Sequence, residues 1–581
     1  EAARVVVVGA DAVGTESLKN LVLPGIKGFT VVDPAALTPP DLGSNFFVAA
    51  ADVAAGANRA ESVAPLLREL NDDLGYAEAR GVTLGSLVAE NGDSGAEFFR
   101  GFDLAIFTSR EANLGDPALA AALAACWAAG VPAIVVRSYG MAAAVRVAVP
   151  ELCVENSRAA APAPDIRVRE MGAAVLAAAP VPRPGERIED LEPKVLEKVP
   201  FVVVLALAVR RWDEAHEDAM GSGGAASSVS EMRAGFKKII EAWRKDGLEE
   251  NLDEAIKFSR LCWEENPGCP QGSVKAVLED PMSQEGFEPA NELQKFLYTK
   301  NKRFWLCAAA LHAFVKNEGG GRIPLSGSLP DMAADTASCV RNLYYSWVNT
   351  GSISAALCSH LSLLSRYVAM QKVYHDRAEQ DMNAVIAHAQ RIFSAHDNFP
   401  LDEAYLRSFV RHARNLRVVR QRSIADELAQ PLPPDVAQMA SDDKGSQLHW
   451  YLAFRAADMF CTKHGRYPGE VLWSELAGLS PETDLERIEA LSTERYEKDL
   501  VAIGDFVSVV EKAAGVSAGA TSADVVQEVV RSGGGVLHNT SAVVGGVVGQ
   551  EAVKLLTRQF EPIDNTLVIN TLNGTTETFR M

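Results

Sequence analysis

The sequence predicts an α/β protein in which a large, mainly helical insert interrupts a mostly parallel sheet. Three observations support this class. Residues 1 to about 155 alternate short apolar strands with helical patterns, residues from about 190 to 496 have helical periodicity, and the rest of the chain returns to strands and helices. Short apolar strands separated by helices are typical of a parallel sheet that helices cover on both faces.

The first α/β region contains four apolar segments with strand character, and helical segments such as Asn58–Asn71 lie between them. Each strand is short and apolar throughout, which indicates burial on both faces of the sheet. The four predicted strands are Arg4–Gly9, Phe29–Asp33, Asp103–Ser109 and Pro132–Ser138.

The end of the chain completes the α/β pattern. Leu537–Phe560 indicates a loop and a buried helix, and Asn565–Met581 indicates two strands that turn at Asn573-Gly574, a strong hairpin signal. We therefore expect one α/β domain in two parts with an insert between them. The expected ranges are 1–160 and 501–581 for the α/β domain and 161–500 for the helical insert.

Three segments of the insert predict helices. The apolar run Val199–Val209 is too short to span a bilayer of about 30 Å and indicates a buried helix. Phe304–Gly319 has apolar residues at helical spacing, with Gly319 as the expected C-cap. Asp402–Leu428 predicts one longer helix, and its six arginines between Arg407 and Arg422 indicate either a solvated face or a surface for an acidic partner.

Composition and charge exclude several classes of function. The formal net charge is -20, which disfavours nucleic acids and anionic membranes as partners because both are bound by positive charge. The 8 cysteines are scattered, which indicates reduced thiols in an intracellular protein and no structural zinc site or other metal site. Because the chain begins with Glu1, almost directly at the first strand, we expect a natural N-terminal segment to precede it.

The turn after the first strand departs from a dinucleotide-binding fingerprint. Gly9 and Gly14 are present, but Asp11 replaces the middle glycine that lets backbone N–H groups approach a pyrophosphate. A carboxylate in a partly dry pocket repels phosphate oxygens. Asp33 ends the second strand, where a ribose-binding acid would stand. The pattern therefore predicts a Rossmann-like fold that has lost its nucleotide.

Segments along nearly the whole chain resemble the ubiquitin-activating enzyme superfamily. More narrowly, they resemble the regulatory subunits of the heterodimeric enzymes that activate the NEDD/RUB ubiquitin-like modifier, the amyloid precursor protein-binding protein type. The first such segment is "GADAVGTESLKNLVLPGIKGFTVVD", from Gly9 to Asp33. The others are Ser44–Phe47, Asn58–Glu61, Val135–Val147, Gly319–Asp335, Asn415–Glu427, Lys463–Gly469 and Val543–Thr566.

The resemblance implies an adenylation-type fold whose own nucleotide site is degenerate. Active members have a D-x-D after the second strand, an N-x-x-R pair and a phosphate-contacting lysine. Here the D-x-D is Asp33-Pro34-Ala35, no arginine follows Asn45 at that spacing, and Arg59 stands near the place of the lysine. We therefore expect no cofactor on this chain, with ATP and magnesium on the partner subunit. The degenerate site comprises Gly9, Asp11, Gly14, Asp33, Asn45 and Arg59.

The resemblance also implies a catalytic-cysteine-type helical domain that lacks its cysteine. None of the eight cysteines stands in the family's thioester motif, and Cys307 and Cys339 are expected to be buried structural thiols. No catalytic residue is therefore assigned. Residues 344–366 are aromatic and serine-rich and depart from the family pattern, as a lineage-specific insertion or a gene-model error.

The implied function is that of a regulatory subunit in protein neddylation, in the cytoplasm and the nucleus. The expected partners are the thioester-forming catalytic subunit, as an obligate heterodimer, and the modifier itself. The family also donates an arginine across the dimer from a segment ahead of the first strand. The expected partner interface includes Pro330, Asp331, Met332, Asp335, Gly545 and Gly546.

Three alternatives are weighed against this hypothesis. A scaffold or adaptor derived from the family would fail to co-purify with a thioester-forming partner. A dinucleotide-dependent oxidoreductase would need room for phosphate at Asp11. The smaller subunit of the SUMO-activating enzyme lacks so long a helical insert, so the length of the chain disfavours it.

Overall fold

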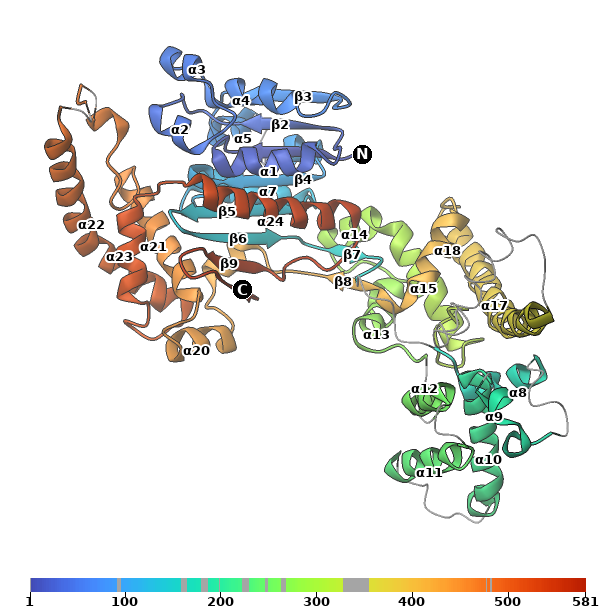
Figure 1. The fold of residues 1–581 in the computed structure, drawn as a ribbon. Helices are drawn as coiled ribbons and strands as arrows, with labels where there is room; N and C mark the ends of the chain where they lie inside the picture. Colours follow the sequence, from blue (N-terminus) through green and yellow to red (C-terminus); the bar gives the residue numbers. More distant parts are fainter. Residues whose placement is uncertain are drawn as a thin grey trace. The chain divides into compact units, whose positions relative to one another are not determined.

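The computed structural model describes residues 2–90, 96–157, 165–178, 186–197, 199–221, 229–245, 249–262, 268–327, 355–476, 478–480 and 483–581. The chain forms two compact units, each described by itself (Figure 1). The sheet unit contains residues 1–158, 291–297 and 418–581, and the helical unit contains residues 159–290 and 298–417.

The sheet unit is built on one eight-stranded sheet, with the order β10-β9-β6-β5-β4-β1-β2-β3. The five strands from β3 to β5 are mutually parallel, while β6, β9 and β10 are antiparallel to their neighbours. The predicted strands and the terminal hairpin are confirmed. The strands are β1 (Arg4–Val8), β2 (Gly28–Val32), β3 (Tyr76–Arg80), β4 (Leu104–Thr108), β5 (Ala133–Tyr139), β6 (Ala142–Ala148), β9 (Thr566–Asn570) and β10 (Thr575–Phe579).

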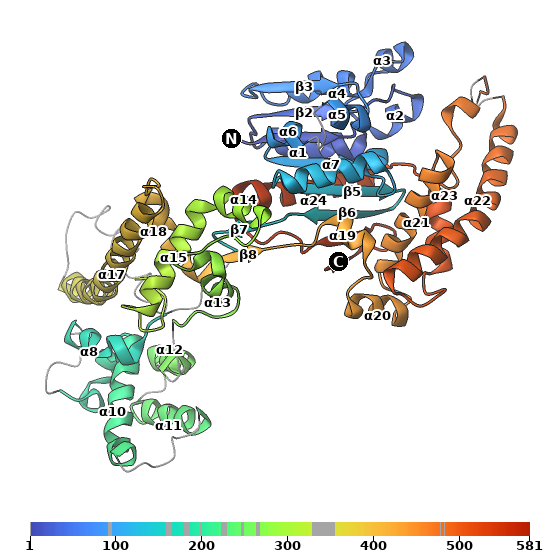
Figure 2. The same ribbon diagram turned by 180° about the vertical axis from the view of Figure 1, so that it is seen from behind.

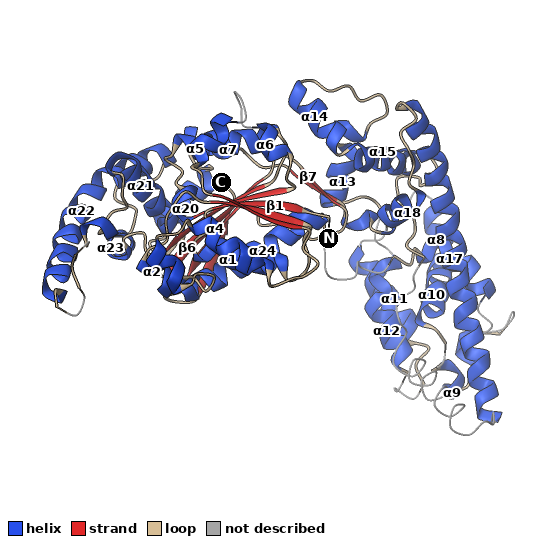
Figure 3. Cartoon of the chain, turned by 90° about the horizontal axis from the view of Figure 1, so that it is seen from above, coloured by secondary structure: helices blue, strands red, loops and turns tan. Residues whose placement is uncertain are grey.

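Helices cover both faces of this sheet (Figure 3), so its central strands are buried and mostly apolar. Val5 and Val7 of β1 face the core with α1, α4 and α24, whereas Val6 and Val8 face the core with α5, α6 and α7. Figure 1 shows α1 and α24 side by side in front of the sheet, and Figure 2 shows α7 on the opposite side. These helices are α1 (Ala12–Val22), α4 (Arg59–Arg68), α5 (Leu84–Glu90), α6 (Ala96–Arg100), α7 (Pro117–Ala128) and α24 (His538–Thr557), with α2 (Pro39–Ser44) and α3 (Ala50–Ala55) after β2.

The second part of the sheet unit begins earlier than the predicted residue 501. Helix α21 packs in one hydrophobic core with Tyr139, Ala142 and Ala144 of β5 and β6, so residues 418–500 belong with the sheet. Helical periodicity identifies a helix but not the core on which it packs, and this is why the predicted boundary was wrong. The added helices are α19 (Ile424–Ala429), α20 (Pro434–Asp442), α21 (Leu448–His464), α22 (Leu485–Ala514) and α23 (Ala523–Ser532).

The helical unit has its own apolar core. The predicted buried helix at Val199–Val209 is confirmed within α10, where residues 201–205 are almost fully buried. Helix α15 ends at Lys316 with Asn317 as its C-cap, so the predicted C-cap at Gly319 was wrong by two residues. The main helices are α8 (Val168–Ala178), α10 (Phe201–Gly221), α11 (Val229–Glu241), α12 (Glu250–Phe258), α13 (Gly272–Glu279), α15 (Lys302–Lys316), α17 (Ala355–Ala395) and α18 (Glu403–Arg411). Of the atypical segment 344–366, residues 344–354 lie outside the described residues.

The single helix predicted over Asp402–Leu428 was wrong. The segment breaks into α18, a 3-10 turn, the short strand β8 (Arg417–Val419) and α19. Three of its six arginines pair with acids of this chain: Arg407 contacts Glu403 and Glu379, Arg414 contacts Asp165, and Arg420 contacts Glu151. Most of these acids are distant in the sequence, so spacing within the segment could not identify them.

Two glycines let α24 lie directly against α1. A Cβ atom on Gly545 would lie 2.6 Å from the Cβ of Glu16, and one on Gly549 would lie 2.7 Å from the Cβ of Asn20. Gly546 is exposed and has open space around it. The close approach of α24 to α1 is therefore made by Gly545 and Gly549, and Gly546 takes no part in it.

We predict opposite effects for two neighbouring substitutions in α24. Gly545→Ala forces α1 and α24 apart and should lower the free energy of unfolding by about 1–3 kcal/mol, the usual cost of overpacking. Gly546→Ala meets nothing within 4 Å and should leave stability unchanged or raise it by up to about 1 kcal/mol, because alanine favours the helix. Urea denaturation of both full-length variants measures the difference, and equal midpoints would contradict this packing.

No helix in the described ranges combines the length and the apolar character that a bilayer crossing requires.

Candidate functional site: a nucleotide-type turn filled by its own side chains

The structure brings all six residues of the predicted degenerate site together. They surround the turn from β1 into α1, at the edge of the sheet where the parallel strands β1, β2 and β4 end. Gly9 has φ +108° beside the backbone of Thr108, and a Cβ on Gly14 would collide with the Gly9 carbonyl. The geometry of a phosphate-binding turn is therefore retained at its first and third glycines.

Asp11 caps the helix that follows the turn. Its Oδ1 accepts hydrogen bonds from the Gly14 N–H and the Thr108 hydroxyl, each at 2.9 Å. The side chain is buried, with 6% of its surface exposed. Burial raises the pKa of the Asp11 carboxyl, and the Gly14 N–H opposes this shift. A carboxylate of the chain thus occupies the helix N-terminus that a phosphate occupies in a working site.

A second carboxylate closes the other side of the turn. Asp33 Oδ2 accepts from the Ala10 N–H at 2.7 Å, and Arg59 lies 3.6 Å from the same oxygen. Arg59 also lies 3.7 Å from Asp41, so its charge is shared between two acids. The guanidinium that stands near the family's lysine position therefore pairs within the chain.

Asn45 ties the loop after α2 to the same turn. Its Nδ2 donates to the Ala10 carbonyl at 3.1 Å, and its Oδ1 accepts from the Thr15 hydroxyl at 3.1 Å. The amide is therefore held by the backbone and by α1. These contacts give the Asn45 side chain a structural role. That role does not require the arginine of an N-x-x-R pair.

Sequence reasoning missed Thr108, the last residue of β4, and Glu111, which follows this strand at the same edge. Burial raises the pKa of Glu111 to about 7, and the nearby Asp33 and Asp116 carboxylates add to this shift. The sequence contained the information needed to find these two residues. The strand β4 was correctly predicted, and the carboxyl ends of parallel strands meet at one edge of a sheet.

This arrangement does not fit a nucleotide. The Ala10 and Gly14 N–H groups already donate to Asp33 and Asp11, so they are not free for phosphate oxygens. Asp11, Asp33 and Glu111 also supply negative charge where a polyphosphate would lie.

Comparison with protein families decides the relationship. The model of the ThiF family matches residues 1–581, the whole chain. The chain belongs to the ThiF family. Two relatives that this chain matches along nearly their whole length confirm the narrower resemblance, to the regulatory subunits. It is 28% identical to the NEDD8-activating enzyme E1 regulatory subunit of Danio rerio, over 100% of this chain and 95% of that protein. It is 29% identical to the same-named protein of Drosophila melanogaster, over 100% and 94%.

The match to a subunit of the SUMO-activating enzyme covers only a short part of each chain. SUMO-activating enzyme subunit 1 of Rattus norvegicus is 41% identical over 70 residues, which are 12% of this ThiF-family chain and 20% of that protein. A match of 70 residues is too short to cover the helical unit, whereas the regulatory-subunit relatives match the whole chain.

Five described thiols of this ThiF-family chain are buried, and a sixth, Cys269, is partly exposed. Cys126, Cys153, Cys262, Cys307 and Cys461 are buried, so the predicted burial of Cys307 is confirmed. Burial raises the pKa of the thiols of Cys126, Cys153 and Cys461 and that of Cys262 to about 12, whereas a nucleophilic cysteine needs a lowered pKa. Cys339 lies outside the described residues.

The predicted interface residues fall into two groups. Pro330, Asp331, Met332 and Asp335 lie outside the described residues. Gly545 is buried against α1, whereas Gly546 lies on the exposed face of α24. Of the two glycines, only Gly546 is therefore placed to meet another protein.

We predict that Glu111 makes the stability of the fold depend on pH. Its pKa is 4.5 in the unfolded chain and about 7 in the folded one, so folding takes up a proton between these values. Its contribution is therefore most favourable below pH 4.5 and is lost as the pH rises through 7. Glu111→Gln should flatten the pH dependence and raise stability at pH 8 by at most about 3 kcal/mol.

Urea denaturation at pH 5, 6, 7 and 8 measures this effect. Glu97→Gln, at an exposed glutamate of α6, is the matched control and should leave the wild-type profile unchanged. An identical profile for Glu111→Gln would show that the carboxyl of Glu111 does not titrate in this range.

Proposed function

We propose that this chain is the regulatory subunit of a heterodimeric NEDD8-activating enzyme. The observation that carries the proposal is similarity along the full length of named regulatory subunits, with both units of this chain included. The turn filled by Asp11 and Asp33 supports the same function, since a regulatory subunit needs the adenylation fold without its nucleotide.

In this function, the partner subunit binds ATP and magnesium, adenylates the modifier and receives it on a cysteine. This chain contributes a rigid sheet unit that braces the partner's adenylation domain and forms part of the surface around the modifier. The closed turn at Asp11 and the buried, high-pKa thiols support a role in which this chain performs neither step itself. We propose that it acts in the cytoplasm and the nucleus.

The alternatives have less support. A dinucleotide-dependent oxidoreductase needs phosphate at the N–H groups that Asp11 and Asp33 occupy. The local match to the SUMO-activating subunit leaves the helical unit unexplained. A scaffold that has left the pathway remains distinguishable by experiment, because it would not support thioester formation.

The isolated chain should not bind ATP measurably. Asp11, Asp33 and Glu111 repel phosphate, and Asp33 and Asp11 occupy two of the amides that would hold it. Isothermal titration calorimetry checks this, with the heterodimer as a positive control. Asp11→Gly alone should not restore binding, because Asp33 still holds the Ala10 N–H. Micromolar ATP affinity of the wild-type chain would overturn the assignment.

Co-expression with the catalytic subunit tests the function directly. We expect the two chains to co-purify and to form a thioester with NEDD8 in the presence of ATP and magnesium. Gly546→Leu should reduce the yield of heterodimer several-fold while the melting temperature of the isolated chain stays nearly unchanged, because Gly546 is exposed.

Gly504→Leu provides the matched control. Gly504 lies on the exposed face of another helix of the sheet unit, α22, and also has nothing within 4 Å of its Cβ position. It should leave assembly unchanged. Equal heterodimer yields for both variants would place the interface elsewhere, and failure of the wild-type pair to form a thioester would reject the proposed function.

A further inference from the structure

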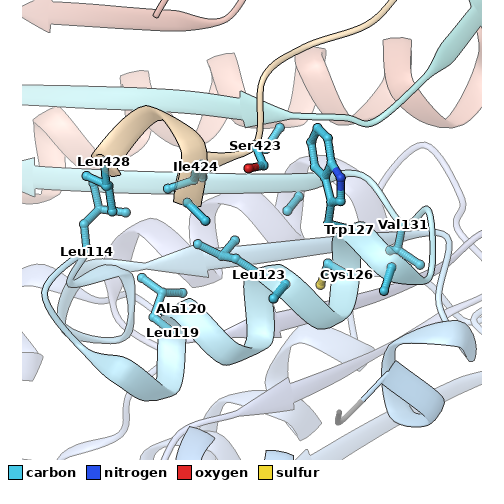
Figure 4. A pocket seen from close by; sticks show the side chains of 15 residues that line it. Leu114, Leu119, Ala120, Leu123, Cys126, Trp127, Val131, Ser423, Ile424 and Leu428 are labelled. Atoms are coloured by element: carbon cyan, nitrogen blue, oxygen red, sulfur yellow. The ribbon is translucent and has the colours of Figure 1, made fainter. Parts of the chain in front are cut away.

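An apolar pocket lies between α7 and α19, on the face of the sheet opposite α1. Its volume is about 170 Å³, and its floor is formed by Ala133 of β5 and Ala148 of β6. Figure 4 shows Leu123 of α7 below Ile424 of α19, while the ring of Trp127 rises from α7 beside Ser423, with the pocket between the two helices. The short side chains of the floor leave this space unfilled.

The pocket is preformed because α19 is held on its far side. Glu427 of α19 is buried, with Oε2 accepting from the Arg146 guanidinium at 2.8 Å and Oε1 accepting from the Tyr451 hydroxyl. Just before the helix, the Gln421 side chain accepts from the Val149 N–H at 3.1 Å. These buried bonds prevent α19 from moving toward α7, which would break them and leave charges unpaired.

The lining carries no charged group. Its polar atoms are the Cys126 thiol, the Trp127 indole N–H and the Ser423 hydroxyl. The Ser423 hydroxyl is already used, because it accepts from the Asp426 N–H at 3.0 Å and donates to the Asp426 carboxylate. The whole segment Pro117–Val131 has no charged residue, although the chain as a whole carries a net charge of -20. The pocket therefore selects a neutral, apolar group.

The volume of the pocket indicates which kind of molecule carries this apolar group. Sites for cofactors and drug-sized ligands occupy roughly 300–1,000 Å³ and contain a few directional polar groups. A cavity of about 150 Å³ holds one benzene ring. Ala120, Ala124 and Ala128 line the pocket and are exposed, so only methyl groups limit the approach of a main chain there.

We propose that this pocket binds one aromatic or branched aliphatic side chain of a polypeptide partner. The side chain enters between α7 and α19, and the partner's main chain lies along the exposed alanines of α7. The partner's polar groups stay outside the pocket, so no free hydrogen-bonding group is needed within it.

The test uses the full-length chain and three small probes. N-acetyl-L-phenylalaninamide represents the side chain with its main chain, toluene represents a free apolar molecule, and N-acetyl-L-asparaginamide is the polar control. Dissociation constants come from saturation-transfer NMR. We expect the phenylalanine probe to bind with a Kd on the order of 1 mM, as befits so small a ligand, and the asparagine probe not to bind.

Two tryptophan substitutions on α7 locate the binding. Ala124→Trp covers the mouth of the pocket and should raise the Kd of the phenylalanine probe at least tenfold. Ala121→Trp is the matched control, since Ala121 is exposed on the same helix but does not line the pocket, and should change the Kd by less than twofold. Melting temperatures of both variants verify that each one folds.

Three outcomes would overturn the proposal. No binding of either apolar probe would mean that the pocket takes no ligand. Binding of toluene without the phenylalanine probe would mean that the mouth does not admit a polypeptide. Unchanged binding in Ala124→Trp would place the probe elsewhere on the chain. Ala148→Val provides a second check. The larger side chain fills part of the floor of the pocket and should also weaken binding of the phenylalanine probe.

Discussion

The sheet unit depends on the close packing of α24 against α1, which joins the two ends of the chain. The N-terminal segment supplies β1 to β6, and the C-terminal segment supplies α24 and the hairpin that pairs with β6. Gly545 and Gly549 bring the backbones together where any side chain would separate them. Because the entropy of closing a loop grows only slowly with its length, a helical unit can be inserted between these segments provided that their ends still meet.

The turn beside α1 shows how an anion site can persist without an anion from outside. The N-terminus of a helix favours negative charge, and an empty site would leave amide groups unsatisfied. Asp11 satisfies this requirement from within the turn, and Asp33 does the same for the Ala10 N–H. The fold thereby keeps the backbone geometry of a nucleotide site while the Ala10 and Gly14 amides are satisfied from within the chain. Burial is the main cause of the raised pKa values of Asp11 and Glu111, and the nearby carboxylate of Asp33 adds to both shifts.

On the opposite face of the sheet, the covering helices are held by different interactions. There, α19 is held by the buried pair of Glu427 and Arg146 in addition to the apolar contacts that Ile424 and Leu428 make in the core shared with α7. A helix fixed by hydrogen bonds need not settle to the distance that gives the densest core, and a gap remains over the alanines of β5 and β6. The two faces of one sheet thus differ, one closed by glycine contacts and the other left partly open by a buried ion pair.

The sequence by itself determined the class of fold, the four strands of the first region, the terminal hairpin and the identity of the degenerate turn. These features depend on local patterns: consecutive apolar residues, Asn-Gly at a hairpin, and glycines at fixed spacing around Asp11. Only the tertiary structure decided where residues 418–500 belong, how the arginines of 407–422 pair, and that Thr108 and Glu111 join the turn. Each of these depends on contacts between residues far apart in the chain, which periodicity and spacing do not encode. Gly549 lies between the two cases, because its spacing from Gly545 is visible in the sequence but its meaning comes from the backbone of α1 against it.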